Sequence, residues 1–111
     1  MKILVIRNIH EIPEDSKNVT FITNLYDEYL LATKYYKQVN LIYTDDILYE
    51  LEKMEKEYMK FNNILGNPPY GKQECTHQKI TCIIPSLLNQ NGKAVLLFIS
   101  QMQYIAFGVS Q

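Results

Sequence analysis

The sequence predicts an α/β fold, a three-layer sandwich in which helices cover both faces of a mostly parallel sheet. Five short runs are apolar, rich in β-branched residues and near-continuous rather than alternating, which is typical of strands buried on both faces of a parallel sheet. Helical patterns lie between most of these runs. With 111 residues, 47% of them apolar and 21% charged, residues 1–111 are expected to form a single globular domain.

The five predicted strands are Ile3–Ile6, Val19–Thr23, Val39–Tyr43, Asn63–Leu65 and Ala94–Ile99. The connection between the first two reads "RNIHEIPEDSKN" and shows no helical periodicity. At about a dozen residues it is barely long enough for a parallel crossover. We therefore expect the first strand to lie at an edge of the sheet or to run antiparallel to the others.

Two helices are predicted by apolar side chains that recur on one face. The first spans Leu25–Tyr36, with a face made by Tyr26, Tyr29, Leu30, Thr33 and Tyr36. The second spans Ile47–Lys60, with Ile47, Leu51, Met54 and Tyr58 on one face and charged residues on the other.

A third helical pattern covers Thr76–Asn89, with a face made by Ile80, Ile83, Ile84, Leu87 and Leu88. Pro85 is expected to kink or split this helix, because proline lacks the backbone donor and clashes with the preceding turn. Gly92 is expected to act as a helix-stop glycine before the last predicted strand.

Charge and composition exclude several classes of protein. The formal net charge is −1, whereas proteins that bind nucleic acid unaided usually present a basic surface. Any contact with DNA is therefore expected to be weak or to depend on another segment or subunit.

No apolar run approaches the ~18 residues of a membrane helix, so we expect a cytoplasmic protein without membrane contact. Cys75, His77 and Cys82 match no zinc or redox spacing, and no metal site is expected.

The stretch "FNNILGNPPYGK" places Asn67-Pro68-Pro69-Tyr70 directly after a predicted strand. In open α/β sheets, ligands bind beyond the carboxyl ends of the strands. The Asn67 carboxamide oxygen and the Pro68 carbonyl can accept hydrogen bonds from an exocyclic aromatic amine, such as N6 of adenine, and can stabilise the positive charge that develops during transfer. The prolines fix φ and so preorganise this carbonyl. Tyr70 offers a flat face on which an extruded base can stack.

This stretch closely resembles the fourth motif of the S-adenosylmethionine-dependent amino-methyltransferases, above all the N6-adenine DNA methyltransferases. The family pattern is Asp/Asn/Ser-Pro-Pro-Tyr/Phe/Trp at the end of the fourth strand of a Rossmann-like sheet. Gly66 and the pair Gly71-Lys72 match a style common among restriction-modification methylases. The resemblance implies catalytic roles for Asn67, Pro68, Pro69 and Tyr70.

The resemblance extends over roughly residues 19–100. "VTFITNLYDEY" resembles the second motif, which implies that Asp27 holds the ribose of S-adenosylmethionine. "VNLIYTDDIL" resembles the third, which implies that Asp46 faces the adenine of the cofactor, and Asn67 would also contact the cofactor. "LLNQNGKAVLLFIS" resembles the helix, glycine turn and fifth strand that follow the fourth motif.

Two parts of the family pattern are missing. The glycine-rich loop that follows the first strand and cradles the methionine moiety is absent, because none of the four glycines follows Ile3–Ile6. The family's last two strands and target-recognition region have no counterpart in the final "QMQYIAFGVSQ". The chain therefore resembles an incomplete class I methyltransferase core, a catalytic-core fragment that is not expected to be active alone.

Each candidate residue also has a simpler interpretation. Asn24 and Asp27 fit a helix N-cap, Asp45 and Asp46 fit a helix start favoured by the dipole, and Asn67–Tyr70 fits a plain Pro-Pro turn.

Two alternative functions stay open: a degenerate, non-enzymatic binding or assembly module, and a protein-glutamine methyltransferase of the release-factor type. In the latter, an aliphatic residue commonly follows the tyrosine, so Gly71-Lys72 favours the DNA branch. A sheet that lacks its last strands exposes an edge, and we therefore expect a homo-oligomer.

Overall fold

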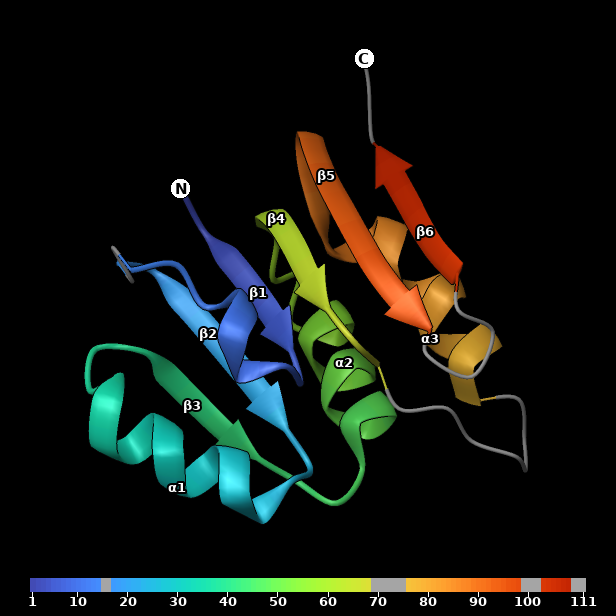
Figure 1. Ribbon diagram of the computed structural model, residues 1–111. Helices are drawn as coiled ribbons and strands as arrows, with labels where there is room; N and C mark the ends of the chain where they lie inside the picture. The colour runs from blue at the N-terminus through green and yellow to red at the C-terminus, as the bar shows by residue number, and fades with distance from the viewer. Residues whose placement is uncertain (15–16, 69–75, 99–102, 109–111) are drawn as a thin grey trace.

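The computed structural model describes residues 1–14, 17–68, 76–98 and 103–108 (Figure 1). Its strands are β1 (Ile3–Ile6), β2 (Val19–Thr23), β3 (Asn40–Tyr43), β4 (Phe61–Gly66), β5 (Leu88–Phe98) and β6 (Gln103–Gly108). Its helices are α1 (Tyr26–Tyr35), α2 (Ile47–Lys56) and α3 (Thr76–Ile83), with short 3-10 turns η1 (Ile9–Glu11) and η2 (Ile84–Leu87).

The strands form one sheet in the order β3-β2-β1-β4-β5-β6. The first five in this order are parallel, and only β6 runs antiparallel to its neighbour β5. The arrowheads of β1 to β5 accordingly point to the same edge of the sheet in Figure 1. The chain moves outward from β1 to β3 and then returns to β4 on the other side of β1, so the strand order reverses between β1 and β4. The predicted, mostly parallel α/β sheet is confirmed.

Strand β1 is central and parallel, so the prediction that it lies at an edge or runs antiparallel is wrong. It pairs with β2 on one side and with β4 on the other, and Leu4, Val5 and Ile6 are all 0% exposed. The short connection to β2 suffices because η1 takes the place of a full crossover helix. Ile9 and Ile12 of this connection are buried and join the core.

The two faces of the sheet are covered by different helices, which confirms the three layers. On one face, α2, α3 and η2 pack against the sheet through a large cluster that includes Leu51, Ile64 and Ile84. On the other face, α1 and the η1 segment pack against Val5 and Phe21. Helix α1 makes this contact through Ala32, while Tyr26 and Leu30 remain 56% and 45% exposed. Thr33 is exposed as well, so the predicted buried face of this helix is wrong in these three residues.

Pro85 splits the third helix as predicted, since α3 ends at Ile83 and continues only as η2. Gly92 is not a helix stop, because it lies buried inside β5. A Cβ at this position would come within 2.7 Å of the Asn89 carbonyl oxygen and 3.1 Å of the Phe61 carbonyl oxygen. The register between β4 and β5 shifts between Phe61 and Asn63, and the glycine permits the close backbone approach at this irregularity.

The C-terminal segment contains a strand that the sequence did not predict. Residues 103–108 form β6 and pair antiparallel with β5, so the expectation of no strand in this segment is wrong. Strands β3 and β6 are the edges of the sheet over the residues described, and self-association through an edge stays a prediction. Within these residues, no helix has the length and apolar character needed to cross a membrane.

Candidate functional site

The carboxyl ends of β1, β2 and β4 bring three polar residues to one edge of the sheet. Ile6 lies opposite Ile22 on β2 and opposite Gly66 on β4. The residues that follow these strands include Arg7 after β1, Asn24 after β2 and Asn67 after β4. Because neighbouring strands lie about 4.8 Å apart, the backbones of these residues lie near one another at the point where the strand order reverses.

Asn67 is held to the sheet by its backbone. Its N–H donates to the Ile6 carbonyl oxygen at 2.8 Å, and the residue is half-buried while Pro68 is buried. Within the described ranges, the Asn67 carboxamide has no hydrogen-bond partner. The structure thus places Asn67 and Pro68 directly after β4, and their catalytic role stays a prediction. Pro69 and Tyr70 lie outside the described residues.

Gly66 allows β4 to end this close to β1. Its φ is +143°, a value that residues with a side chain rarely adopt, and a Cβ would lie only 2.0 Å from the Ile6 carbonyl oxygen. The glycine before the proline pair therefore has a structural role that fixes where Asn67 emerges from the sheet.

The loop after β1 adopts left-handed backbone conformations without glycine. Arg7 has φ 56° and Asn8 has φ 46°. Asn8 stabilises the turn through its side-chain oxygen, which accepts from the N–H of His10 at 3.3 Å. The following residue, Ile9, is buried in the core. In place of a glycine-rich loop, the chain thus has a short turn that packs onto the sheet.

Glu28 joins this loop to the start of α1. One carboxylate oxygen, Oε2, accepts from the Ile9 N–H at 3.0 Å, and the other, Oε1, accepts from Thr23 Oγ1 at 2.9 Å. Thr23 is 0% exposed, and its Oγ1 also accepts from the Leu25 N–H at 3.0 Å. The sequence reasoning missed Glu28. The available signal was a threonine that ends a strand, followed five residues later by an acid in the first helical turn.

The two acids predicted to contact the cofactor lie at the same edge. Asp27 is exposed in the first turn of α1, and its cofactor role stays a prediction. Leu25, not Asn24, is the N-cap of α1 and makes no side-chain cap bond, so the N-cap interpretation of Asn24 is wrong. Asp46 caps α2, because its Oδ1 accepts from the Tyr49 N–H at 3.0 Å. The helix-start interpretation of Asp46 is confirmed, and its contact with a cofactor stays a prediction.

Within the residues that the structure describes, two buried polar atoms at this edge have no hydrogen-bond partner. They are Nε of Arg7 and Oδ1 of Asn24. Buried polar groups are nearly always paired, so an unpaired donor and an unpaired acceptor on neighbouring strand ends require an explanation. Sequence reasoning did not identify either residue as part of a site, because only the pairing of β1 with β2 brings them together.

Replacing Thr23 with valine is expected to lower the free energy of unfolding by about 1 to 3 kcal/mol, because the Leu25 N–H and the Glu28 carboxylate each lose a part-buried hydrogen bond while the shape is preserved. Urea denaturation followed by circular dichroism measures this. The control is Thr33→Val on the exposed side of α1, which removes the hydrogen bond from Thr33 Oγ1 to the Leu30 carbonyl oxygen. This substitution is expected to change the free energy of unfolding by no more than about 0.5 kcal/mol. Equal stability of the two variants would contradict the role of Thr23.

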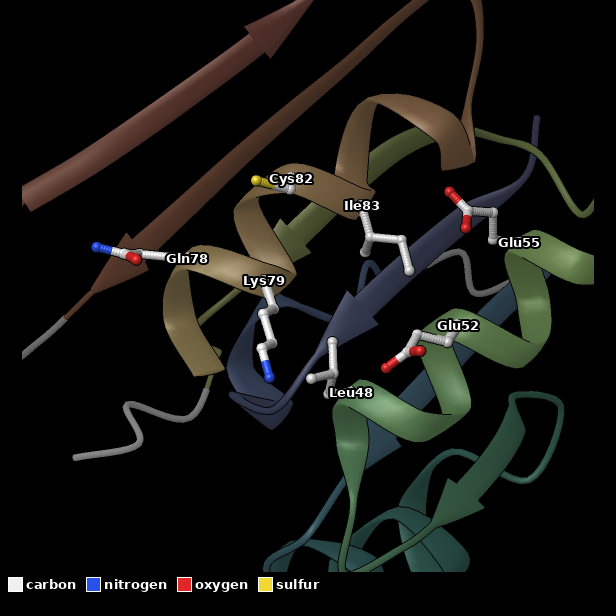
Figure 2. A pocket seen from close by; sticks show the side chains of 7 residues that line it. All are labelled: Leu48, Glu52, Glu55, Gln78, Lys79, Cys82 and Ile83. Atoms are coloured by element: carbon white, nitrogen blue, oxygen red, sulfur yellow. The ribbon is translucent and has the colours of Figure 1, made fainter. Parts of the chain in front are cut away.

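A groove of about 620 Å³ lies between α2 and α3 (Figure 2). The residues that line it are Leu48, Glu52, Glu55, Gln78, Lys79, Cys82 and Ile83. Figure 2 shows the two glutamates on α2 and the lysine and cysteine on α3. No group of three or more His, Cys, Asp or Glu residues in the described part of the chain could hold a metal ion. The described residues that line the groove combine apolar side chains with two glutamates and one lysine, and Asn67 is not among them.

No protein-family model and no curated protein sequence matches the chain. Several solved structures do. SMU.776, a candidate methyltransferase complexed with SAH, aligns with a TM-score of 0.67 and 12% identity over 91% of this chain. TrmN from Thermus thermophilus aligns with a TM-score of 0.64 and 15% identity over 91% of this chain. PKMT2 from Rickettsia typhi in complex with AdoHcy aligns with a TM-score of 0.59 and 23% identity over 86% of this chain.

The chain spans only part of these proteins: 33% of SMU.776, 34% of TrmN and 20% of PKMT2. At these identities the likeness shows the fold. The parallel strands with helices on both faces form the Rossmann-like α/β sheet that these structures share with this chain.

Proposed function

We propose that this chain is the catalytic core of an S-adenosylmethionine-dependent methyltransferase that acts on an exocyclic amino group, with N6 of adenine in DNA as the acceptor. The observation that carries the proposal is the position of Asn67. Its carboxamide has no partner within the described residues, and its backbone is fixed at the reversal of strand order between β1 and β4. A free carboxamide there is available to a ligand. The shared fold with proteins that hold SAH or AdoHcy supports the same conclusion.

The chain's own residues account for the orientation of the acceptor. The Asn67 carboxamide oxygen and the Pro68 carbonyl oxygen accept hydrogen bonds from the two N–H groups of the amine, which turns the lone pair of its nitrogen toward the methyl donor. Both hydrogen bonds become stronger as positive charge develops on that nitrogen. Half-burial of Asn67 and burial of Pro68 reduce competition from water and keep the pair preorganised.

The groups at the carboxyl edge fit S-adenosylmethionine, which when bound supplies an electrophilic methyl group. The buried, unpaired atoms of Arg7 and Asn24 need partners that the described residues do not provide. Asp27 and Asp46 are exposed after β2 and β3, where carboxylates can accept hydrogen bonds from ribose hydroxyls or from the amino group of the adenine ring. The cofactor would be held by Arg7, Asn24, Asp27 and Asp46.

Contact with DNA is proposed to involve more than this chain. The net charge of −1 supplies little attraction to phosphates, so another segment or subunit is proposed to provide most of the affinity. At the same edge, Tyr26, Tyr29 and Tyr43 form an aromatic cluster, with ring centroids of Tyr29 and Tyr43 5.0 Å apart. Because Tyr26 and Tyr43 are 56% and 49% exposed, the cluster offers flat surfaces to unpaired bases.

A non-enzymatic binding module is the second candidate. The observation that favours it is the loop after β1, which contains no glycine and buries Ile9 in the core. Such a loop has less backbone freedom to surround a cofactor than a glycine-rich one.

Calorimetry with S-adenosylmethionine separates the two candidates. The enzyme proposal expects binding at micromolar affinity, and it expects Asp27→Ala to weaken that binding several-fold. Stability should fall by no more than about 1 kcal/mol, because this exposed side chain makes no hydrogen bond within the described residues and contributes only as an acid in the first turn of α1. Asp45→Ala, an equally exposed acid in the next connection, is the matched control and should leave the affinity unchanged. If no heat of binding is detected at S-adenosylmethionine concentrations up to millimolar, the enzyme proposal is overturned in favour of a binding module.

A further inference from the structure

The sheet is covered over only part of the face that carries α1. On this face, α1 and the η1 segment pack over β1, β2 and β3 through the cluster that contains Val5, Phe21 and Ala32. On the opposite face, α2, α3 and η2 form the other cluster. In Figure 1, α2 and α3 lie behind the sheet, and no described helix lies in front of β4, β5 and β6.

The side chains that β4, β5 and β6 present on this uncovered area are apolar. The strand register places Leu65 opposite Val5 of the covered part, Val95 opposite Leu65, and Ala106 opposite Val95. Leu65 is half-buried, Val95 is 42% exposed and Ala106 is exposed, whereas the next residue of β5, Leu96, is 0% exposed on the opposite face. Parallel strands are almost always covered on both faces, so this open sheet face, made by Leu65, Val95 and Ala106, is expected to be covered by another molecule.

Helix α1 carries a second uncovered apolar area on the same side of the sheet. Its contact with the sheet is made by Ala32, while Leu30 and Leu31 are each 45% exposed and Tyr35 is 64% exposed. At 3.6 residues per turn, Leu30 and Leu31 lie about 200° and about 100° around the helix from Ala32. They therefore point away from the strands beneath α1, and the chain's own sheet cannot bury them.

We propose that two copies of this chain form a two-fold dimer in which α1 of each copy packs on the open sheet face of the other. A helix is about 10 Å thick, and α1 stands that far above β2 and β3, so a second helix fits beside it over β4, β5 and β6. The two helices would then form one shared layer between the two sheets.

Two-fold symmetry makes the two contacts of this dimer identical. Each copy supplies one helix and one sheet face, so both uncovered apolar areas are buried at once. The contact leaves the edges of β3 and β6 unpaired and is therefore different from a pairing of edge strands. It does not depend on the proposed methyl transfer.

Sedimentation equilibrium tests the dimer, which the unmodified chain is expected to form with a dissociation constant of about 1 to 10 µM. Val95→Glu and Leu31→Lys alter the two sides of the contact. Each should raise this constant at least about 100-fold, because a charge is buried in both copies of the contact. Circular dichroism should be unchanged, since both side chains are exposed in the single chain. Tyr49→Lys, an exposed position of α2 on the opposite face, is the matched control and should keep the dimer.

A mixture of the two variants reports which surfaces meet. A mixed dimer of Val95→Glu with Leu31→Lys contains one unmodified contact and one in which the two substitutions meet with opposite charges. The mixture is therefore expected to dimerise within about 10-fold of the unmodified chain, whereas each variant alone stays monomeric. Monomers in the mixture as well would overturn the pairing of α1 with the open sheet face.

Two further outcomes would overturn the inference. One is an unmodified chain that stays monomeric up to about 200 µM. The other is a dimer that both substitutions leave intact, because it would use a different surface, such as an edge strand.

A measurement on the unmodified chain decides the inference if a variant loses its fold. Isotope-filtered nuclear Overhauser spectra are recorded on an equal mixture of labelled and unlabelled chains. Contacts are expected between the Val95 methyl groups of one copy and the methyl groups of Leu30 or Leu31 of the other. Their absence in a dimeric sample would overturn the inference.

Discussion

Replacement of Gly66 by alanine is expected to lower the free energy of unfolding by about 3 to 5 kcal/mol, the sum of overpacking and backbone strain. The added Cβ would lie 2.0 Å from the Ile6 carbonyl oxygen, and this oxygen belongs to backbone that pairs with β2 and β4 and cannot rotate away. The φ of +143° adds strain for any residue other than glycine. Because small domains are typically stable by only about 5 to 15 kcal/mol, this change removes a large share of the total. Urea denaturation measures it.

Gly108→Ala is the matched control for this substitution. A Cβ at position 108 meets no atom within 4 Å, so its effect is expected within about 0.5 kcal/mol. If the two alanine variants were equally stable, β4 would not approach β1 as closely as described.

Replacement of Asn67 by alanine is expected to reduce methyl transfer to adenine-containing DNA by about 10²- to 10³-fold, the usual cost of removing one group that stabilises developing charge. Stability should change little, because the carboxamide has no partner within the described residues. The rate is measured with radiolabelled S-adenosylmethionine, and calorimetry is run in parallel to report cofactor affinity.

Two further variants sharpen this experiment. Asn67→Asp keeps an oxygen acceptor and is expected to retain more activity than Asn67→Ala. Asn40→Ala removes an exposed carboxamide from the amino end of β3, at the opposite edge of the sheet, and should not affect the rate. A measurable rate of the unmodified chain that Asn67→Ala matches would refute the role given to Asn67.

Most of the sheet could be predicted from the sequence, because strands buried on both faces must be apolar along their whole length. The position of β1 could not be predicted in this way. The short connection excludes β1 from the centre of the sheet only if a crossover needs a full helix. The short η1 segment instead buries Ile9 and Ile12 and covers the sheet with fewer residues. Gly92 was misinterpreted for a related reason, since its role depends on the contact with Phe61, a residue distant in sequence.

Only the part of the candidate site that lies within one short segment could be predicted from the sequence. Asn67 and Pro68 follow a strand in both the sequence pattern and the structure. Arg7 and Asn24 carry no local signal, because they come from separate segments that only the pairing of β1 with β2 brings together.

The environment of the tyrosines in α1 differs from the prediction. Their spacing predicts a buried face, but Tyr26 and Tyr29 pack against Tyr43 at the edge of the sheet.

The central place of β1 has a consequence for the order in which the protein folds. Lys2 and Asn62, which are 60 positions apart, are joined by hydrogen bonds in both directions, from the Lys2 N–H to Asn62 Oδ1 and from the Asn62 N–H to the Lys2 carbonyl. During synthesis on the ribosome, β1 can pair only with β2 until β4 has emerged. Contacts between such distant positions slow folding, since a long loop must close before they form. The sheet is therefore completed late, and the Gly66–Asn67 corner takes its final position only at that step.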